Sequence, residues 1–115
     1  ISDADPMRAA DLAARVASAF PAVAVHAGAP DPAGFDIAVN ATSSGLKPDD
    51  PLPMRVESLT PGMIVVDIIM EPAETRLLAE AKARGCITQP GWPMMECQME
   101  GFSNFLDAER KMRHG

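Results

Sequence analysis

Apolar side chains in residues 6–20 recur every three or four positions, which predicts a helix with one apolar face. An Asp followed by Pro is a typical helix start, because the Asp side chain accepts from the first free amides and Pro suits the first helical position. Asp5 and Pro6 therefore predict where this helix begins, and Pro21 predicts its end. The apolar face comprises Ala9, Leu12, Ala13, Val16 and Phe20.

The same spacing predicts two further helices. Residues 71–85 form a predicted helix with its leucines facing inward and Gly85 as its stop. Residues 91–115 form a long final helix, in which Gly101 costs about 1 kcal/mol relative to alanine. The short stretch 54–59 predicts a helical turn. The apolar face of the final helix comprises Met95, Met99, Phe102, Phe105 and Leu106.

Short apolar segments between the helices predict strands. Residues 61–70 contain the run MIVVDIIM, with apolar side chains on both faces, which suits a parallel sheet covered on both sides. Strands that alternate with helices predict an α/β fold, a doubly wound and mostly parallel sheet with helices on both faces. The other predicted strands are residues 22–27, 35–42 and 86–89, with residues 1–3 as a strand remnant.

The composition fits one packed domain, and its charge excludes some partners. The chain has 115 residues, of which 47% are hydrophobic, so a modest core is expected. The net charge of −6 argues against non-specific binding to nucleic acids or anionic membranes, since both require a basic surface. Because the sequence carries no secretory signal, Cys86 and Cys97 are predicted to be free thiols in a cytoplasmic protein.

Asp3 is a candidate cofactor ligand, because it lies between a predicted strand and a helix. In a dinucleotide-binding fold, an acid at the end of the second strand accepts hydrogen bonds from the adenosine ribose. An Asp before a helix is more often a simple cap, but Asp5 suits that role better. The glycine loop that precedes such an acid by about 20 residues is absent from the sequence. We therefore expect the chain to be a piece of a longer protein.

Other candidate residues each have a plainer alternative. The stretch NATSSG, residues 40–45, suits either a close approach of a cofactor to the backbone or an ordinary turn. Gln98 lies among apolar neighbours in the last predicted helix, as a substrate ligand or an idle surface amide. His26, His114 and the two cysteines lack the paired spacing of a zinc site, so no metal is expected.

Three blocks of the sequence share their order and spacing with one enzyme family. They are DIAVNATSSGLKPDDPLP, VVDIIMEPAETRLLAEAKARGC and PGWPMMECQMEGFSNFL. Together they resemble the cofactor domain of the shikimate dehydrogenase family. The match covers most of residues 36–106, and residues 1–16 fit the segment just upstream. Its most specific features are NATS before the Pro-rich DDPLP, and Asp67 with Pro72 and Thr75 ahead of a leucine-rich helix.

The resemblance implies that residues 1–115 are an incomplete Rossmann-type, nicotinamide-dinucleotide-binding domain. The family transfers hydride between NAD(P) and the ring hydroxyl of shikimate, or of quinate in some members. A Lys–Asp pair in its N-terminal substrate domain performs the proton transfer, and neither residue matches a position in this sequence. No catalytic residue is therefore assigned to this chain, which alone is expected to be inactive.

The resemblance also assigns ligand roles to matching positions. Ile68 matches a residue that packs near the nicotinamide, and Gly91 and Met94 match positions beside its ring and amide. Gln98 matches the glutamine that hydrogen-bonds the substrate. Positions that match the cofactor-lining loop are Asn40, Ala41, Thr42 and Ser43.

Three positions depart from the family pattern. Met70 stands where many shikimate enzymes have Tyr, which leaves the substrate open among shikimate, quinate and related hydroxy acids. Pro93 replaces a glycine in the turn before the last helix. Ala4 replaces the arginine that pairs with the 2′-phosphate in NADP-preferring members, and Asp3 would repel that phosphate. We therefore expect NAD to be preferred over NADP.

A second hypothesis is a non-catalytic Rossmann-like module that binds a partner. An upstream substrate domain and glycine loop in the gene would favour the enzyme over this module. The expected partner of the enzyme is a shikimate- or quinate-like small molecule rather than a nucleic acid or a membrane. A homodimer is one assembly that the resemblance allows.

Overall fold

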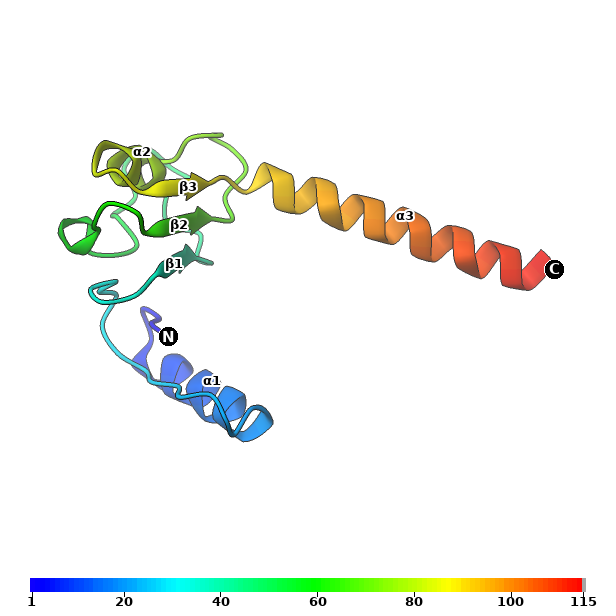
Figure 1. The fold of residues 1–115 in the computed structure, drawn as a ribbon, viewed down its shortest axis with the longest axis horizontal. Helices are drawn as coiled ribbons and strands as arrows, with labels where there is room; N and C mark the ends of the chain where they lie inside the picture. The colour runs from blue at the N-terminus through cyan, green and yellow to red at the C-terminus, as the bar shows by residue number, and fades with distance from the viewer. Residues whose placement is uncertain (115) are drawn as a thin grey trace.

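The computed structural model describes residues 1–114, in which helices alternate with short strands (Figure 1). The predicted final helix is present, but its apolar face is largely exposed. Met99, Phe102 and Phe105 are each more than 60% exposed. The elements in chain order are α1 (Pro6–Ala19), β1 (Ile37–Asn40), η1 (Val56–Ser58), β2 (Ile64–Asp67), α2 (Arg76–Ala83), β3 (Ile87–Gln89) and α3 (Trp92–His114).

Within residues 1–114 the three strands form one parallel sheet in the order β1-β2-β3. Asn40 pairs in register with Asp67, and Val66 pairs with Gln89. This arrangement confirms the predicted α/β class. Because parallel strands end at the same edge of a sheet, the loops that follow β1, β2 and β3 all begin at this carboxyl edge.

Helix α2 covers one face of the sheet and forms the core with it. The Thr75 hydroxyl caps the helix by accepting from the amide of Leu78 at 3.3 Å. The chain turns away after α2 at Gly85, whose φ of 80° is a left-handed conformation that glycine adopts readily. The buried core residues are Val56, Leu59, Met63, Val65, Leu77, Leu78 and Ala81.

The opposite face of the sheet is bare within the described chain. Ile37, Val39 and Ile87 are each more than half exposed, and they share that face with the partly buried Ile64 and Val66. Helices α1 and α3 contact none of the other elements in residues 1–114, and α3 extends away from the sheet (Figure 1). The expectation of helices on both faces is therefore met on one face only.

The predicted strand at 22–27 is wrong, because this segment begins in a turn and continues without regular structure. The amino group of Ile1 donates to the carbonyl of His26 at 2.8 Å, and the amide of Gly28 donates to the carbonyl of Ile1 at 2.9 Å. Backbone hydrogen bonds therefore join the start of the chain to residues 26–28 at one residue only, Ile1. A strand needs a partner along its length, and neither segment finds one in the described residues.

The structure confirms the predicted start of α1, and it shortens other elements. Asp5 caps α1 by accepting from the amide of Met7 at 2.9 Å, with Pro6 as the first helical residue. The strands at β1 and β2 occupy four residues each, because the chain leaves the sheet after Asn40 and Asp67. Helix α2 begins only after Thr75, because the preceding residues 68–75 form a loop.

Candidate functional site

A buried polar cluster lies where β1 and β2 end. Asn40, Asp67 and Thr75 are each at most 2% exposed. The Asp67 carboxylate accepts from Asn40 Nδ2 at 3.2 Å and from the hydroxyl of Thr75 at 2.8 Å. It also accepts from the amide of Ile69 at 3.1 Å. The cluster therefore joins the ends of both strands to the start of α2.

The amide side chain of Asn40 is fully engaged within the protein. Its Nδ2 also donates to the carbonyl of Ser44 at 3.1 Å. Its Oδ1 accepts from the amide of Thr42 at 3.1 Å and from the hydroxyl of Thr42 at 2.7 Å. An amide has two donor hydrogens and two acceptor sites, and all four are used here. Asn40 therefore shapes the loop that follows β1 and has no side-chain group left for a cofactor.

The loops after β2 and β3 touch at Gly91. A Cβ at Gly91 would overlap the carbonyl of Ile68 and would lie 2.8 Å from the carbonyl oxygen of Ile69. Only glycine permits this close approach. The amide of Ile68 also donates to the carbonyl of Asn40 at 3.2 Å. The segments that follow all three strands therefore meet at the carboxyl edge of the sheet.

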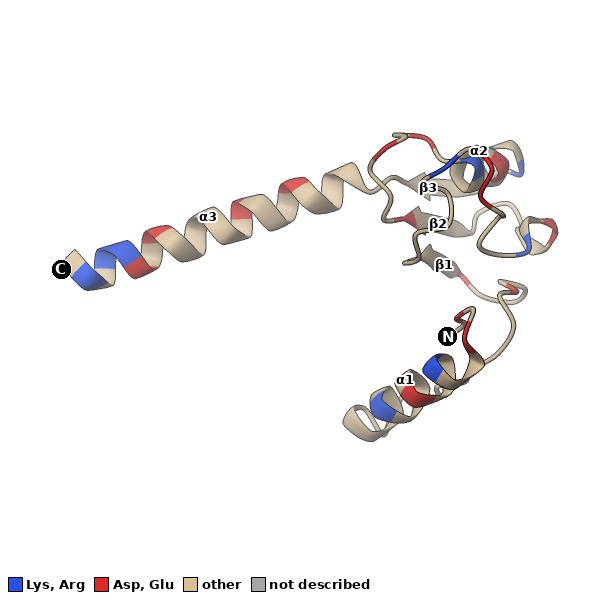
Figure 2. Ribbon diagram, turned by 180° about the vertical axis from the view of Figure 1, so that it is seen from behind, with Lys and Arg blue, Asp and Glu red and all other residues tan. Residues whose placement is uncertain are grey.

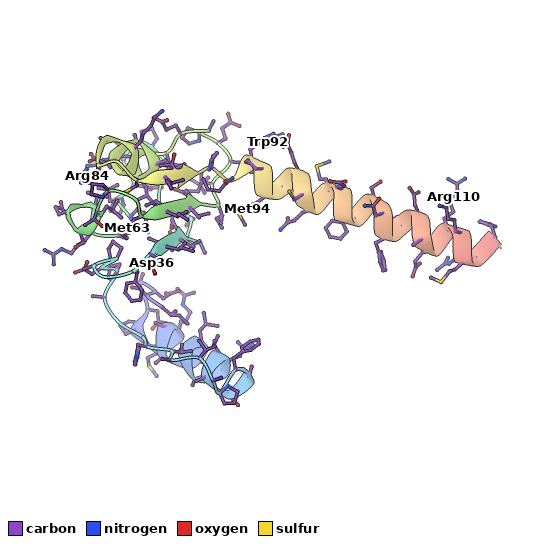
Figure 3. All side chains as sticks on the ribbon, in the orientation of Figure 1. Asp36, Met63, Arg84, Trp92, Met94 and Arg110 are labelled. Carbon is purple, nitrogen blue, oxygen red and sulfur yellow. The ribbon has the colours of Figure 1, made fainter. Side chains whose placement is uncertain are left out.

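Several predicted cofactor ligands are accessible at this edge. Ala41, Thr42 and Ser43 are exposed in the loop after β1. Ile68 is 40% exposed and Met94 is 41% exposed. Met94 lies in the first turn of α3, where that helix leaves the sheet (Figure 3). These side chains form an apolar and hydroxyl-bearing surface that a flat ring could pack against.

Asp3 has a charged neighbour that our sequence analysis missed. Arg8 Nη2 lies 3.3 Å from Asp3 Oδ1, and Arg8 Nε lies 3.8 Å from Asp5 Oδ2. Asp3 Oδ1 also accepts from the amide of Asp5 at 2.8 Å. Arg8 lies three residues after Asp5, a spacing that brings helical side chains together and could have revealed it. A cation therefore stands beside the carboxylate that we expect to bind a ribose.

Comparison with known proteins shows which enzymes the chain is similar to. No protein-family model matches the chain. A shikimate dehydrogenase (NADP(+)) from Geobacillus kaustophilus (strain HTA426) is 48% identical over 67 residues, 57% of this chain and 24% of that protein. More than half of this chain is therefore similar in sequence to shikimate dehydrogenases. The chain spans about a quarter of the length of the curated relatives it matches.

Two solved structures in this comparison share the fold. One is the ligand-free 5-ketofructose reductase of Gluconobacter sp. strain CHM43, with a TM-score of 0.71 and 36% identity over 83% of this chain and 36% of that chain. The other is quinate dehydrogenase from Corynebacterium glutamicum in complex with NAD, with a TM-score of 0.70 and 34% identity over 82% of this chain and 35% of that chain. The partial Rossmann-type α/β fold is confirmed.

The structure does not bring every predicted site residue to the carboxyl edge of the sheet. Gln98 is exposed on α3, where it lines a shallow groove together with Gly101, Phe102 and Phe105. Asp3 precedes α1, and neither helix packs on the sheet within residues 1–114. A cleft of about 390 Å³ between residues 45–52 and 71–77 is lined by none of the predicted ligands.

Other candidate chemistries find little support in the part of the chain that the structure describes. Among residues 1–114, no group of three or more His, Cys, Asp or Glu side chains could hold a metal ion. Cys86 and Cys97 are both free thiols. Burial raises the pKa of the Cys86 thiol, which disfavours its thiolate. None of the helices in this range combines the length and apolar character needed to cross a membrane.

Charge is distributed unevenly over the helices (Figure 2). Acidic and basic residues alternate along α1, whereas basic residues gather in the last turn of α3. The carboxyl edge of the sheet carries one fully buried acid, Asp67, beneath a mostly uncharged surface of Ala41, Thr42, Ser43 and Ile68. Within residues 1–114 this edge lacks exposed cations, so it suits the nicotinamide and ribose end of a dinucleotide better than the phosphates.

Proposed function

We propose that this chain is the cofactor-binding part of a shikimate- or quinate-dehydrogenase-like oxidoreductase, with NAD preferred and NADP the alternative. The observation that carries the proposal is the junction of three strand-end segments at Gly91, in a chain related to shikimate dehydrogenases. Ligands of open α/β sheets bind beyond the carboxyl ends of the strands. A bound nicotinamide cofactor would supply the hydride acceptor or donor.

The residues of this chain then bind and orient the cofactor. Ile68 and Met94 offer partly exposed apolar side chains to the nicotinamide ring. Gly91 lets the loops after β2 and β3 pack together beside the ring, because any side chain there would strike the carbonyl of Ile68. Ala41, Thr42 and Ser43 line the cofactor from the loop after β1. Asp3 accepts hydrogen bonds from the adenosine ribose.

The substrate class follows from similarity and from Gln98. The quinate dehydrogenase that shares this fold and the shikimate dehydrogenase relatives point to a ring hydroxy acid. Gln98 carries an exposed amide that can donate to a carboxylate or accept from a hydroxyl. Met70, near the start of the loop 68–75, is 37% exposed and offers the substrate only an apolar side chain. Association of two copies stays a prediction.

The test is a substrate and cofactor panel on the complete enzyme that carries this segment. Reduction of NAD or NADP is followed at its absorbance with shikimate and with quinate, and the 115-residue chain alone serves as an inactive control. Gln98→Ala should raise the KM for the hydroxy acid about tenfold and leave the cofactor KM unchanged, because it removes a substrate hydrogen bond. Glu100→Gln, on the same helix, is the matched control.

Two results would contradict the proposal. A complete enzyme that binds neither NAD nor NADP would favour a non-catalytic module. An enzyme that reduces cofactor with neither shikimate nor quinate would require a different substrate class, and equal effects of the two variants would remove Gln98 from the site.

A further inference from the structure

We propose that Asp67 is a positioning residue. Its buried carboxylate holds in place the loops that follow β1 and β2 at the carboxyl edge of the sheet. The inference rests on the proposed function. Asp67 itself is 0% exposed, so it touches no cofactor. Its effect passes through Asn40 to the loop after β1 and through Ile69 to the loop after β2.

The two oxygens of the carboxylate serve different parts of the molecule. Oδ1 accepts from Asn40 Nδ2 at 3.2 Å and from the amide of Ile69 at 3.1 Å, which are both at the cofactor edge. Oδ2 accepts from the hydroxyl of Thr75 at 2.8 Å, which belongs to the cap of α2. One oxygen therefore supports the loops and the other supports the helix, so the two roles can be separated by mutation.

Oriented hydrogen-bond donors compensate for the burial of the Asp67 carboxylate. None of the ion pairs found within residues 1–114 involves Asp67. A buried carboxylate without a cation depends on its hydrogen bonds, because it has lost its water. The donors on Asn40, Ile69 and Thr75 must therefore keep their directions, and this fixes the backbone that carries them.

Each of the two hydrogen bonds at Oδ1 leads to a residue that we predict to contact the cofactor. We call these two connections the loop arms, one through Asn40 and one through Ile69. With Nδ2 held by Asp67, Asn40 presents Oδ1 to both the amide and the hydroxyl of Thr42. The hydroxyl of Thr42 then accepts from the amide of Ser44 at 3.1 Å. On the other arm, the bond to Ile69 fixes the peptide that follows Ile68, whose carbonyl abuts Gly91. The carboxylate of Asp67 thus sets the distance between the loops after β1 and β2.

The experiment compares cofactor KM, kcat and unfolding in variants of the complete enzyme. Asp67→Ala removes both loop arms and should raise the cofactor KM at least about tenfold. Asp67→Asn should restore most of the affinity, because its amide oxygen can take the place of Oδ1 and its NH₂ can donate to the hydroxyl of Thr75. Thr75→Val is the matched control: it destabilises the cap of α2 but leaves the bonds to Asn40 and Ile69, so the cofactor KM should change by less than about twofold.

Asn40→Ala provides a second variant should Asp67→Ala not fold, because it breaks the loop arm through Asn40 and leaves Asp67 bonded to Ile69 and Thr75. It should also raise the cofactor KM. The inference is overturned if Thr75→Val raises the cofactor KM as much as these variants, or if Asp67→Asn fails to restore it. A wild-type enzyme that binds neither NAD nor NADP would instead overturn the proposed function and, with it, this inference.

Discussion

Asn40 on β1 and Asp67 on β2 are register partners whose side chains bond directly, with Asn40 Nδ2 donating to Asp67 Oδ1 at 3.2 Å. Both are almost fully buried at the carboxyl edge of the sheet. A polar pair at this depth is stable only when every donor and acceptor finds a partner. No buried side-chain nitrogen or oxygen in the described residues lacks one.

Replacing Asn40 by Ala should lower the free energy of unfolding by about 2 kcal/mol, because buried partners lose their hydrogen bonds. The change removes the side-chain donor to the carbonyl of Ser44 and one of the two donors to Asp67 Oδ1, which keeps the amide of Ile69. Urea unfolding measures the effect. Ser43→Ala, in the exposed part of the same loop, is the control and should change stability by less than about 0.5 kcal/mol. Equal losses of unfolding free energy in the two variants would show that the hydrogen bonds of Asn40 contribute little to stability.

Cofactor choice should depend on Asp3 and Arg8 together. Asp3 repels a 2′-phosphate, whereas Arg8, 3.3 Å away, attracts it. Asp3→Asn should therefore raise the ratio of kcat/KM for NADP over NAD about tenfold, and Arg8→Ala should lower it. Asp11→Asn, another exposed acid of α1, should leave the ratio unchanged. A wild-type preference for NADP would refute the expected NAD preference.

Replacement by alanine should have opposite effects on stability at Gly91 and at Gly101. Gly91→Ala should destabilise the protein by about 2 kcal/mol and raise the cofactor KM, because the new Cβ meets the carbonyls of Ile68 and Ile69. Gly101→Ala should stabilise α3 by about 1 kcal/mol, because it lies inside a helix with no atom near the new Cβ. Thermal unfolding compares the two. If Gly91→Ala changed neither stability nor the cofactor KM, the close contact between the loops after β2 and β3 would be contradicted.

Stability should fall in acid partly through Asp50. The amides of Lys47 and Gly45 donate to this carboxylate and hold its pKa below the usual value of about 3.9. A lowered pKa in the folded state stabilises the protein above the unfolded pKa, and this contribution is lost as the pH falls through the folded value. Asp50→Asn should therefore flatten the fall in stability below about pH 4. Asp49→Asn, at the neighbouring exposed acid, should leave the slope unchanged.

Local sequence determined that the segments of α1, α2 and α3 are helical and where α1 begins, whereas α2 begins five residues later than predicted. The Asp5-Pro6 start of α1 depends on a cap within a few residues, and the leucines of α2 face the core as their spacing predicts. The parallel α/β class also followed from the alternation of elements. The residues of the carboxyl edge were predicted by resemblance. Their roles in binding a cofactor stay predictions.

Tertiary structure decided what depends on a partner distant in sequence. Residues 22–27 have a strand-like pattern, but hydrogen bonds to a single residue cannot make a strand. The pattern of α3 predicted an apolar face and could not say whether anything covers it. Asn40 was predicted to line a cofactor, whereas its side chain is used by Asp67, 27 residues away. Sequence specifies local geometry, because caps and spacing act over a few residues, and only the folded chain decides which polar groups meet.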